Sequence, residues 1–163
     1  MNETGSQRLL LSDLLSTATV ELNLKGGQRD PILEELVNRI PELEGNDEAR
    51  QRLLRALHER EQLHSTGIGD GIALPHSRNA LIGIVEKPVM VFGRHPRGVP
   101  YGAIDGEPAR LFFLLVAPTV TTHLQILARL TRILRDPRVR RDLLAVSRPE
   151  KVIDLIREAE LQP

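Results

Sequence analysis

His76 stands where a side chain could act as a nucleophile. It lies near the end of the short apolar stretch GIALPHS (71–77), directly after Pro75. A proline fixes its own φ and restricts the residue before it, so the imidazole would be held on a stiff backbone. A neutral imidazole is a good nucleophile near pH 7, since its reference pKa is about 6.5. The other interpretation is a half-buried histidine whose ring is hydrogen-bonded to a carbonyl group.

The segment before His76 is rich in glycine. Gly67, Gly69 and Gly71 would let the backbone turn tightly and bring its amides close to a ligand. The run GIGDG fits neither the P-loop nor the dinucleotide-binding pattern, because it lacks the Lys-Ser/Thr ending and a helix directly after it. On its own the glycine run is therefore weak support for an anion site.

His123 is the second candidate. It begins the predicted helix 121–136 on the same face as core leucines, so its side chain should point inward. A helix N-terminus disfavours imidazolium and attracts anions, and the hydroxyls of Thr121 and Thr122 could donate to a phosphate. The alternative is a solvated or capping histidine.

Arg60 is the third candidate and lies on the predicted helix 46–61. It continues the apolar stripe of Leu53 and Leu57, and an arginine that points inward needs an anionic partner such as a phosphate. The alternative is a side chain whose stem covers the core and whose head reaches water. The remaining histidines are predicted to be helix-surface or loop residues without a role: His58, His64 and His95.

Composition limits the classes of function. The chain has 163 residues, with 22 Lys plus Arg and 22 Asp plus Glu, and this balance argues against a general nucleic-acid binder. The absence of cysteine excludes disulfides, thiolate zinc sites and a cysteine nucleophile. No run of 18 apolar residues predicts a membrane span, and the polar start MNETGSQ is not a signal peptide, so we expect a cytoplasmic protein.

Hydrophobic periodicity predicts an α/β fold in a single domain. We expect a small mixed β-sheet flanked by helices on both faces over residues 9–160, preceded by a flexible tail of residues 1–8. The continuous apolarity of residues 109–118 indicates a strand buried on both faces. The other predicted strands are 17–24, the end of 65–77, and 87–94; the predicted helices are 29–40, 46–61, 121–136, 138–145 and 148–160.

Residues 95–108 are rich in proline and glycine and include the turn pair Asp105–Gly106. They are therefore predicted to form a loop or hairpin. Arg94 and Arg97, at the start of this segment, are expected to be solvated, with contact to a partner protein as the alternative.

Two segments resemble a known family. ALHEREQLHSTGIGDGIALPHSR (56–78) is similar to the active-site segment of type-2 enzyme IIA domains of the bacterial phosphotransferase system, the fructose/mannitol and nitrogen-regulatory group. AIDGEPARLFFLLVAPTVTTHLQILARL (103–130) resembles the downstream segment of the same family. The resemblance covers most of residues 9–160, and the run STGIGDGIALPH is specific to it.

The resemblance implies a phosphotransferase that accepts a phosphoryl group from the histidine-containing phosphocarrier protein without a cofactor or metal. His76 matches the phosphorylated histidine, His123 the second active-site histidine, and Arg60 an arginine beside the phosphate. Ser77 stands where Gly or Ala is common in the family. Because serine is also small, we expect this difference to have little effect on phosphorylation. Asp70 stands where Asn is common, and its charge is expected to weaken phosphate affinity near the site.

Several functions remain open at this point. The first is a stand-alone nitrogen-regulatory IIA that signals to a transporter, kinase or transcription factor by its phosphorylation state; the second is a sugar-specific IIA that passes the phosphoryl group to a separate IIB cysteine. We favour the first, because no IIB, membrane or phosphocarrier domain accompanies the domain. A metal-dependent hydrolase using His76 and His123 is disfavoured because no third ligand is evident. A purely structural relic is disfavoured because all three candidate residues are present.

Overall fold

The computed structural model describes residues 9–77 and 83–162. Within them, five strands form one mixed sheet in the order β1-β4-β5-β3-β2. The β4–β5 and β2–β3 pairs are antiparallel, whereas β1–β4 and β3–β5 are parallel. The strands are β1 (Val20–Glu21), β2 (Gly67–Gly69), β3 (Ile72–Ala73), β4 (Val89–Val99) and β5 (Ala109–Val116).

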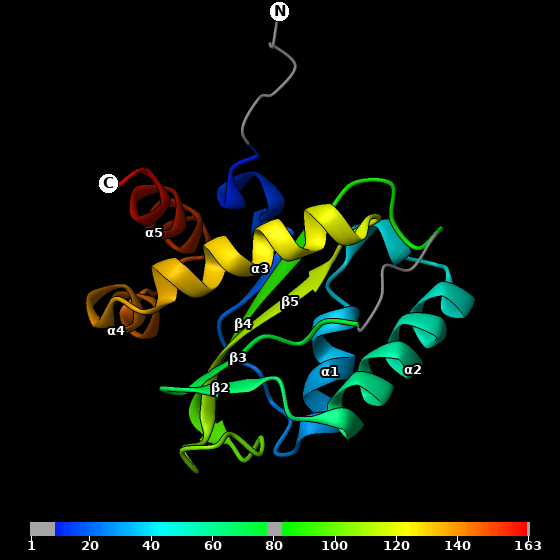
Figure 1. The fold of residues 1–163 in the computed structure, drawn as a ribbon, viewed down its shortest axis with the longest axis horizontal. Helices are drawn as coiled ribbons and strands as arrows, with labels where there is room; N and C mark the ends of the chain where they lie inside the picture. Colours follow the sequence, from blue (N-terminus) through cyan, green and yellow to red (C-terminus); the bar gives the residue numbers. More distant parts are fainter. Residues whose placement is uncertain (1–8, 78–82, 163) are drawn as a thin grey trace, which may run out of the picture.

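Helices cover both faces of the sheet (Figure 1). On one face lie α1 (Arg29–Val37) and α2 (Asp47–Leu63). On the other lie α3 (Val120–Leu134), α4 (Pro137–Ala145) and α5 (Pro149–Leu161), together with the 3₁₀ turn η1 (Leu11–Leu14). The predicted α/β class, with a mixed sheet flanked on both faces, is confirmed. The proposed tail of residues 1–8 lies outside the described residues.

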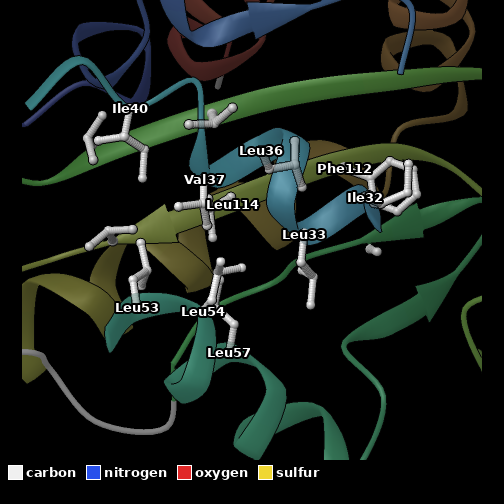
Figure 2. Close-up of a cluster of buried hydrophobic side chains, with 14 of the residues drawn as sticks. Ile32, Leu33, Leu36, Val37, Ile40, Leu53, Leu54, Leu57, Phe112 and Leu114 are labelled. Carbon is white, nitrogen blue, oxygen red and sulfur yellow. The ribbon is translucent and has the colours of Figure 1, made fainter. Parts of the chain in front are cut away.

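Strand β5 separates two hydrophobic cores. Phe112 and Leu114 pack with α1 and α2, as Figure 2 shows, whereas Phe113 and Leu115 pack with α3, α4 and α5. Successive side chains of a strand point to opposite faces, so a strand covered on both sides must be apolar at every position. The apolar run from Leu111 to Val116 predicted this arrangement, and its burial on both sides stabilises the sheet.

Helices α2 and α3 each begin at a side-chain cap. Asn46 accepts a hydrogen bond from the Ala49 amide (3.1 Å) at the start of α2, and Thr119 accepts one from the Thr122 amide (3.2 Å) at the start of α3. Both satisfy amides that have no partner within the helix. Helix α1 is shorter than predicted: it ends at Val37, because Ile40 precedes Pro41 and is held in an extended conformation.

Two strand predictions are corrected. Residues 17–24 contain only the two-residue strand β1, since Thr17–Thr19 form a 3₁₀ turn in which the Ser16 amide donates to Thr19 Oγ1 (3.0 Å). Residues 95–108, predicted as a loop or hairpin, join the antiparallel strands β4 and β5, but β4 continues through Val99 into this segment. A proline is tolerated there because β1 pairs only with Phe92 and Gly93, which leaves that side of β4 free.

The extended part of β4 contains a bulge built around His95. This side chain is buried, and its Nδ1 accepts hydrogen bonds from the amides of Arg97 (3.2 Å) and Gly98 (3.0 Å). The bulge shifts the register between Arg94 and Val99, after which β4 pairs again with Ala109. His95 is thus a structural residue and not the loop residue predicted from sequence.

Arg94 is also a structural residue, contrary to the expectation that it is solvated. Its guanidinium donates to the carbonyl oxygens of Leu143 (3.2 Å), Leu144 (3.2 Å) and Val146 (2.6 Å) at the end of α4, and its Nε donates to Leu22 (3.2 Å). The last carbonyls of a helix lack partners within the helix, and a cation satisfies them well.

The glycines of GIGDG form the turn between β2 and β3. Gly69 (φ 92°) and Gly71 (φ 77°) have left-handed backbone conformations, and between them Asp70 (φ 56°) does too. The Asp70 amide donates to the Asp105 carboxylate (2.9 Å), and a Cβ on Gly69 would approach that carboxylate to 2.9 Å. The glycines therefore serve a hairpin that begins the His76 strand.

We predict that Gly69→Ala destabilises the protein more than Gly106→Ala. Both residues have positive φ (92° and 75°), which costs an alanine about 1–2 kcal/mol, but nothing lies within 4 Å of a Cβ on Gly106. At Gly69 the Asp105 carboxylate must also move. Urea denaturation of the two variants measures the difference, and equal midpoints would contradict this account of the turn.

Candidate active site

Backbone hydrogen bonds hold His76 beside the end of β5. The Leu74 amide donates to the Thr66 carbonyl (2.9 Å), and the Leu115 amide donates to the Pro75 carbonyl (3.0 Å). His76 forms a parallel bridge with Leu115. Ile72 and Leu74 belong to the core on the α3 side, and because side chains alternate along an extended chain, His76 faces the same side.

The ring of His76 has a defined tautomer. Its Nδ1 lies 2.6 Å from the Leu74 carbonyl oxygen, which can only accept, so Nδ1 carries the proton. Burial lowers the pKa of His76, and the nearby Arg60 guanidinium lowers it further, while the Leu74 carbonyl and Glu61 act in the opposite direction. At neutral pH the ring is therefore uncharged, with an unprotonated Nε2 available as a nucleophile.

His123 points inward, as its helical position predicted, and lies against His76. The two ring centroids are 5.2 Å apart, with the planes tilted by 57°. His123 is buried in the first turn of α3, where burial and the His76 ring lower its pKa to about 4. Both rings are neutral at pH 7, because burial lowers the pKa of each.

Arg60 supplies positive charge to the same site. It lies in the last turn of α2, where its Nη1 donates to the His64 carbonyl (2.6 Å) that follows the helix. The side chain is half-buried, and its charge lowers the pKa of His76. The structure thus brings all three candidate residues to one place: His76 from the strand after β3, His123 from α3 and Arg60 from α2.

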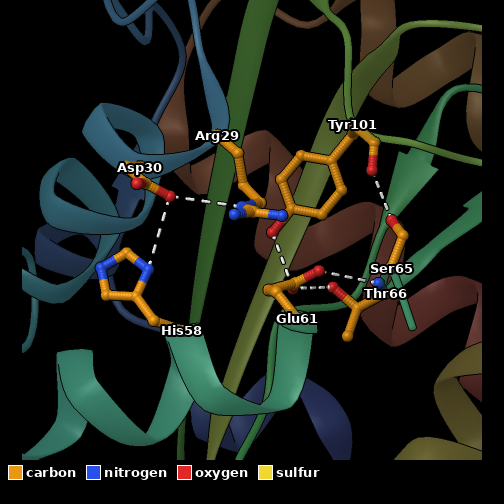
Figure 3. Close-up of polar contacts among 7 residues, drawn as sticks. All are labelled: Arg29, Asp30, His58, Glu61, Ser65, Thr66 and Tyr101. Atoms are coloured by element: carbon orange, nitrogen blue, oxygen red, sulfur yellow. Dashed lines mark hydrogen bonds and ion pairs between the residues drawn. The ribbon is translucent and has the colours of Figure 1, made fainter. Parts of the chain in front are cut away.

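Glu61 is a buried residue of this region that sequence reasoning did not identify. Its carboxylate accepts hydrogen bonds from the Thr66 amide (2.9 Å), the Thr66 hydroxyl and the Tyr101 hydroxyl (2.9 Å), as Figure 3 shows. Helical spacing is the sequence feature that could have indicated its burial. Glu61 follows Leu57 by four positions, whereas Arg60 follows Leu57 by three. Either position continues an apolar stripe, and the structure buries Glu61 more completely.

Asp70 does not lie beside His76. It belongs to the β2–β3 turn, next to the beginning of β5, whereas His76 lies next to its end. Six residues of extended chain separate them, on the order of 15–20 Å. Salt screens exposed charges over about 10 Å, so the expected weakening of phosphate affinity by Asp70 is not supported.

The other histidines have separate surroundings. His58 contacts the Asp30 carboxylate (3.4 Å), which Figure 3 also shows, and His64 ends α2. Among the described residues, no three His, Asp or Glu side chains are grouped as ligands of one metal ion. In the same residues no helix has the length and apolarity needed to cross a membrane.

Comparison with known proteins identifies the family of this chain. Residues 13–159 match the family model for the phosphoenolpyruvate-dependent sugar phosphotransferase system, EIIA 2. The chain belongs to this family, as the resemblance of its two motifs predicted. It is 35% identical over 150 residues to the fructose-specific EIIABC component of Bacillus subtilis, covering 91% of this chain and 23% of that protein. It is 34% identical over 137 residues to the nitrogen regulatory protein of Bradyrhizobium diazoefficiens, covering 83% and 86%.

Solved structures of both kinds of member are similar to this chain. The nitrogen regulatory protein IIA-Ntr of Neisseria meningitidis superposes with a TM-score of 0.77 at 28% identity, covering 90% of this chain and 98% of that one. Enzyme IIA mannitol of Escherichia coli, in complex with phosphorylated enzyme IIB mannitol, superposes with a TM-score of 0.73 at 25% identity, covering 87% and 96%. The family thus includes both regulatory and sugar-specific proteins.

The lowered pKa of His123 predicts a pH-dependent stability. Between pH 7 and 4.5 the unfolded chain binds a proton at residue 123, whereas the folded chain, with its pKa at about 4, largely does not. Stability must therefore fall as the pH falls, by about 2 kcal/mol from this residue. Urea denaturation across this range should show a steeper decline for the wild type than for His123→Gln. Parallel curves would contradict the lowered pKa.

Proposed function

We propose that this chain is a phosphocarrier that accepts a phosphoryl group on Nε2 of His76 from the histidine-containing phosphocarrier protein. The observation that carries the proposal is the hydrogen bond from His76 Nδ1 to the Leu74 carbonyl, which leaves Nε2 as the free nucleophile. The His76 residue as a whole is only partly buried. Membership of the EIIA 2 family supports the reaction type.

The transfer needs no net proton movement on this chain. A bond forms between phosphorus and Nε2 as the bond between phosphorus and the donor's nitrogen breaks, and Nδ1 keeps its proton throughout. The phosphorylated ring then carries positive charge, which the Leu74 carbonyl oxygen stabilises through a charge-assisted hydrogen bond. Return of the group to an acceptor follows the same path in reverse.

His123 and Arg60 are proposed to stabilise the phosphoryl oxygens. Phosphoryl transfer depends mainly on positioning and on charge near the equatorial oxygens. Arg60 has donors beyond the one that binds His64, and His123 can offer one N–H while its ring stays neutral. One permanent cation and one neutral donor bind a phosphoryl group without making its release costly.

Within this function we propose a nitrogen-regulatory role, in which the phosphorylation state of His76 controls a transporter or kinase. Similarity to the Bradyrhizobium and Neisseria proteins over most of their lengths supports it. The alternative is a fructose- or mannitol-type IIA that passes the group to a IIB cysteine. Similarity to the Bacillus fructose component and to the Escherichia coli IIA of the IIA–IIB complex favours that alternative.

The phosphocarrier function predicts a single phosphoryl adduct. Incubation with phosphoenolpyruvate, enzyme I and the phosphocarrier protein should add one group, measured by intact mass, to the wild type and none to His76→Ala. Addition of a purified fructose- or mannitol-type IIB should remove the group only if the sugar-specific alternative holds. An unmodified wild type, with the phosphocarrier competent on another IIA, would overturn the proposal.

The role of Arg60 predicts a specific loss of rate. Arg60→Ala should slow phosphorylation of His76 by roughly 10²–10³-fold, since it removes the permanent cation from the site. Arg55→Ala is the matched control, because Arg55 is exposed on the same helix. Rapid-quench phosphorylation measures both rates, and circular dichroism checks that α2 persists. Equal rates in the two variants would exclude Arg60 from the transfer.

A further inference from the structure

The buried Glu61 carboxylate accepts three hydrogen bonds from residues outside its own helix. Three donors converge on it, and two of them belong to Thr66, which lies five residues further along the chain (Figure 3). A buried carboxylate is costly unless its oxygens are satisfied, so this arrangement fixes the Thr66 backbone firmly against α2. Ser65 adds to the attachment through a hydrogen bond from its hydroxyl to the Tyr101 carbonyl.

Thr66 is connected to the reacting ring by backbone hydrogen bonds. Its carbonyl accepts from the Leu74 amide (2.9 Å), and the Leu74 carbonyl in turn accepts from Nδ1 of His76 (2.6 Å). The amide and the carbonyl of Leu74 therefore join Thr66 on one side to His76 on the other. The position of the Leu74 carbonyl decides which imidazole nitrogen carries the proton.

We propose that Glu61 is a positioning residue for phosphoryl transfer. Through Thr66 and Leu74 it holds the His76 ring in the tautomer whose Nε2 is the nucleophile. The inference rests on the proposed function and deepens it, because it explains how a residue that does not touch the phosphoryl group sets the reactivity of the ring. Tyr101 donates to the same carboxylate but lies outside the connection to His76.

The negative charge of Glu61 also favours phosphorylation of His76, in addition to the hydrogen bonds that position the ring. It raises the pKa of His76, against burial and the Arg60 guanidinium, and this favours the positive charge that the phosphorylated ring carries. Other ionisable groups in the described part of this region include His123 on α3, which contacts the His76 ring, and Tyr101, whose pKa is raised by burial and by Glu61. Arg29 lies beside Tyr101 and lowers its pKa (Figure 3). Replacing Glu61 with a neutral residue should therefore lower the pKa of His76 further.

The test combines a structural and a kinetic measurement on Glu61→Gln. Nitrogen-15 NMR of histidine-labelled, unphosphorylated protein should show an Nε2–H population of His76 that the wild type lacks, and a lower pH of half-protonation. Phosphorylation by the phosphocarrier protein should slow by roughly tenfold or more, as expected for a misplaced nucleophile. An unchanged tautomer, titration and rate in folded Glu61→Gln would overturn the inference.

Tyr101→Phe is the matched control. It removes one hydrogen bond to the same carboxylate but leaves the charge of Glu61 and both Thr66 bonds in place. It should lower the free energy of unfolding but leave the His76 tautomer unchanged. The transfer rate should stay within about twofold of the wild-type rate, which is the usual uncertainty when the effects of separate mutations are compared. If it altered the tautomer as much as Glu61→Gln does, the effect would be general loosening, and the inference would fail.

A second variant covers the case in which Glu61→Gln does not fold. Thr66→Val removes only the hydroxyl hydrogen bond to Glu61 and keeps the hydrogen bonds of the Thr66 amide and carbonyl. It should increase the Nε2–H population of His76, as Glu61→Gln does. An unchanged tautomer in this variant would overturn the inference. The NMR measurement needs no phosphoryl donor. A wild type that accepts no phosphoryl group would therefore sink the proposed function, whereas an unchanged tautomer would sink only the role of Glu61.

Discussion

Burial of β5 on both faces is the constraint on which the rest of the structure depends. The strand pairs with β4 on one side and β3 on the other, and its alternating side chains divide the interior into two cores. Because Leu111–Val116 are covered on both faces, the strand cannot shift by one residue without exchanging the two sets of side chains. The backbone amide of Leu115 then fixes Pro75, and with it the neighbouring His76, at the end of this rigid strand.

The positive charge around His76 is low because the two histidines of the site are neutral. Two imidazoles in contact are both neutral, since burial lowers the pKa of each, and among residues 9–77 and 83–162 the Arg60 guanidinium supplies permanent positive charge. A site with three cations would bind phosphate tightly and release it slowly. Under the proposed function, a neutral pair with one cation suits a phosphoryl group that must arrive and leave at similar free energies, because binding both states strongly would not speed the transfer.

The sequence predicted the parts of this protein that local pattern determines. The apolar run of β5, the Asn46 cap and the inward face of His123 follow from periodicity and capping preferences. The bulge at His95 was missed, because prolines and glycines also occur in strands where one edge is unpaired. Glu61 was missed because positions three and four residues after Leu57 are equivalent in a helical pattern. Its burial depends on Tyr101, which is distant in the sequence.

Arg94 joins two elements whose stabilities would otherwise differ. Helix α4 has nine residues, too few to persist in water on its own, and its final carbonyls are satisfied by a side chain that belongs to β4. The end of the helix therefore cannot fray without breaking bonds to the sheet. Helix α4 and β4 behave as one cooperative unit, so the slowest amides of this helix exchange with solvent only when the sheet itself opens.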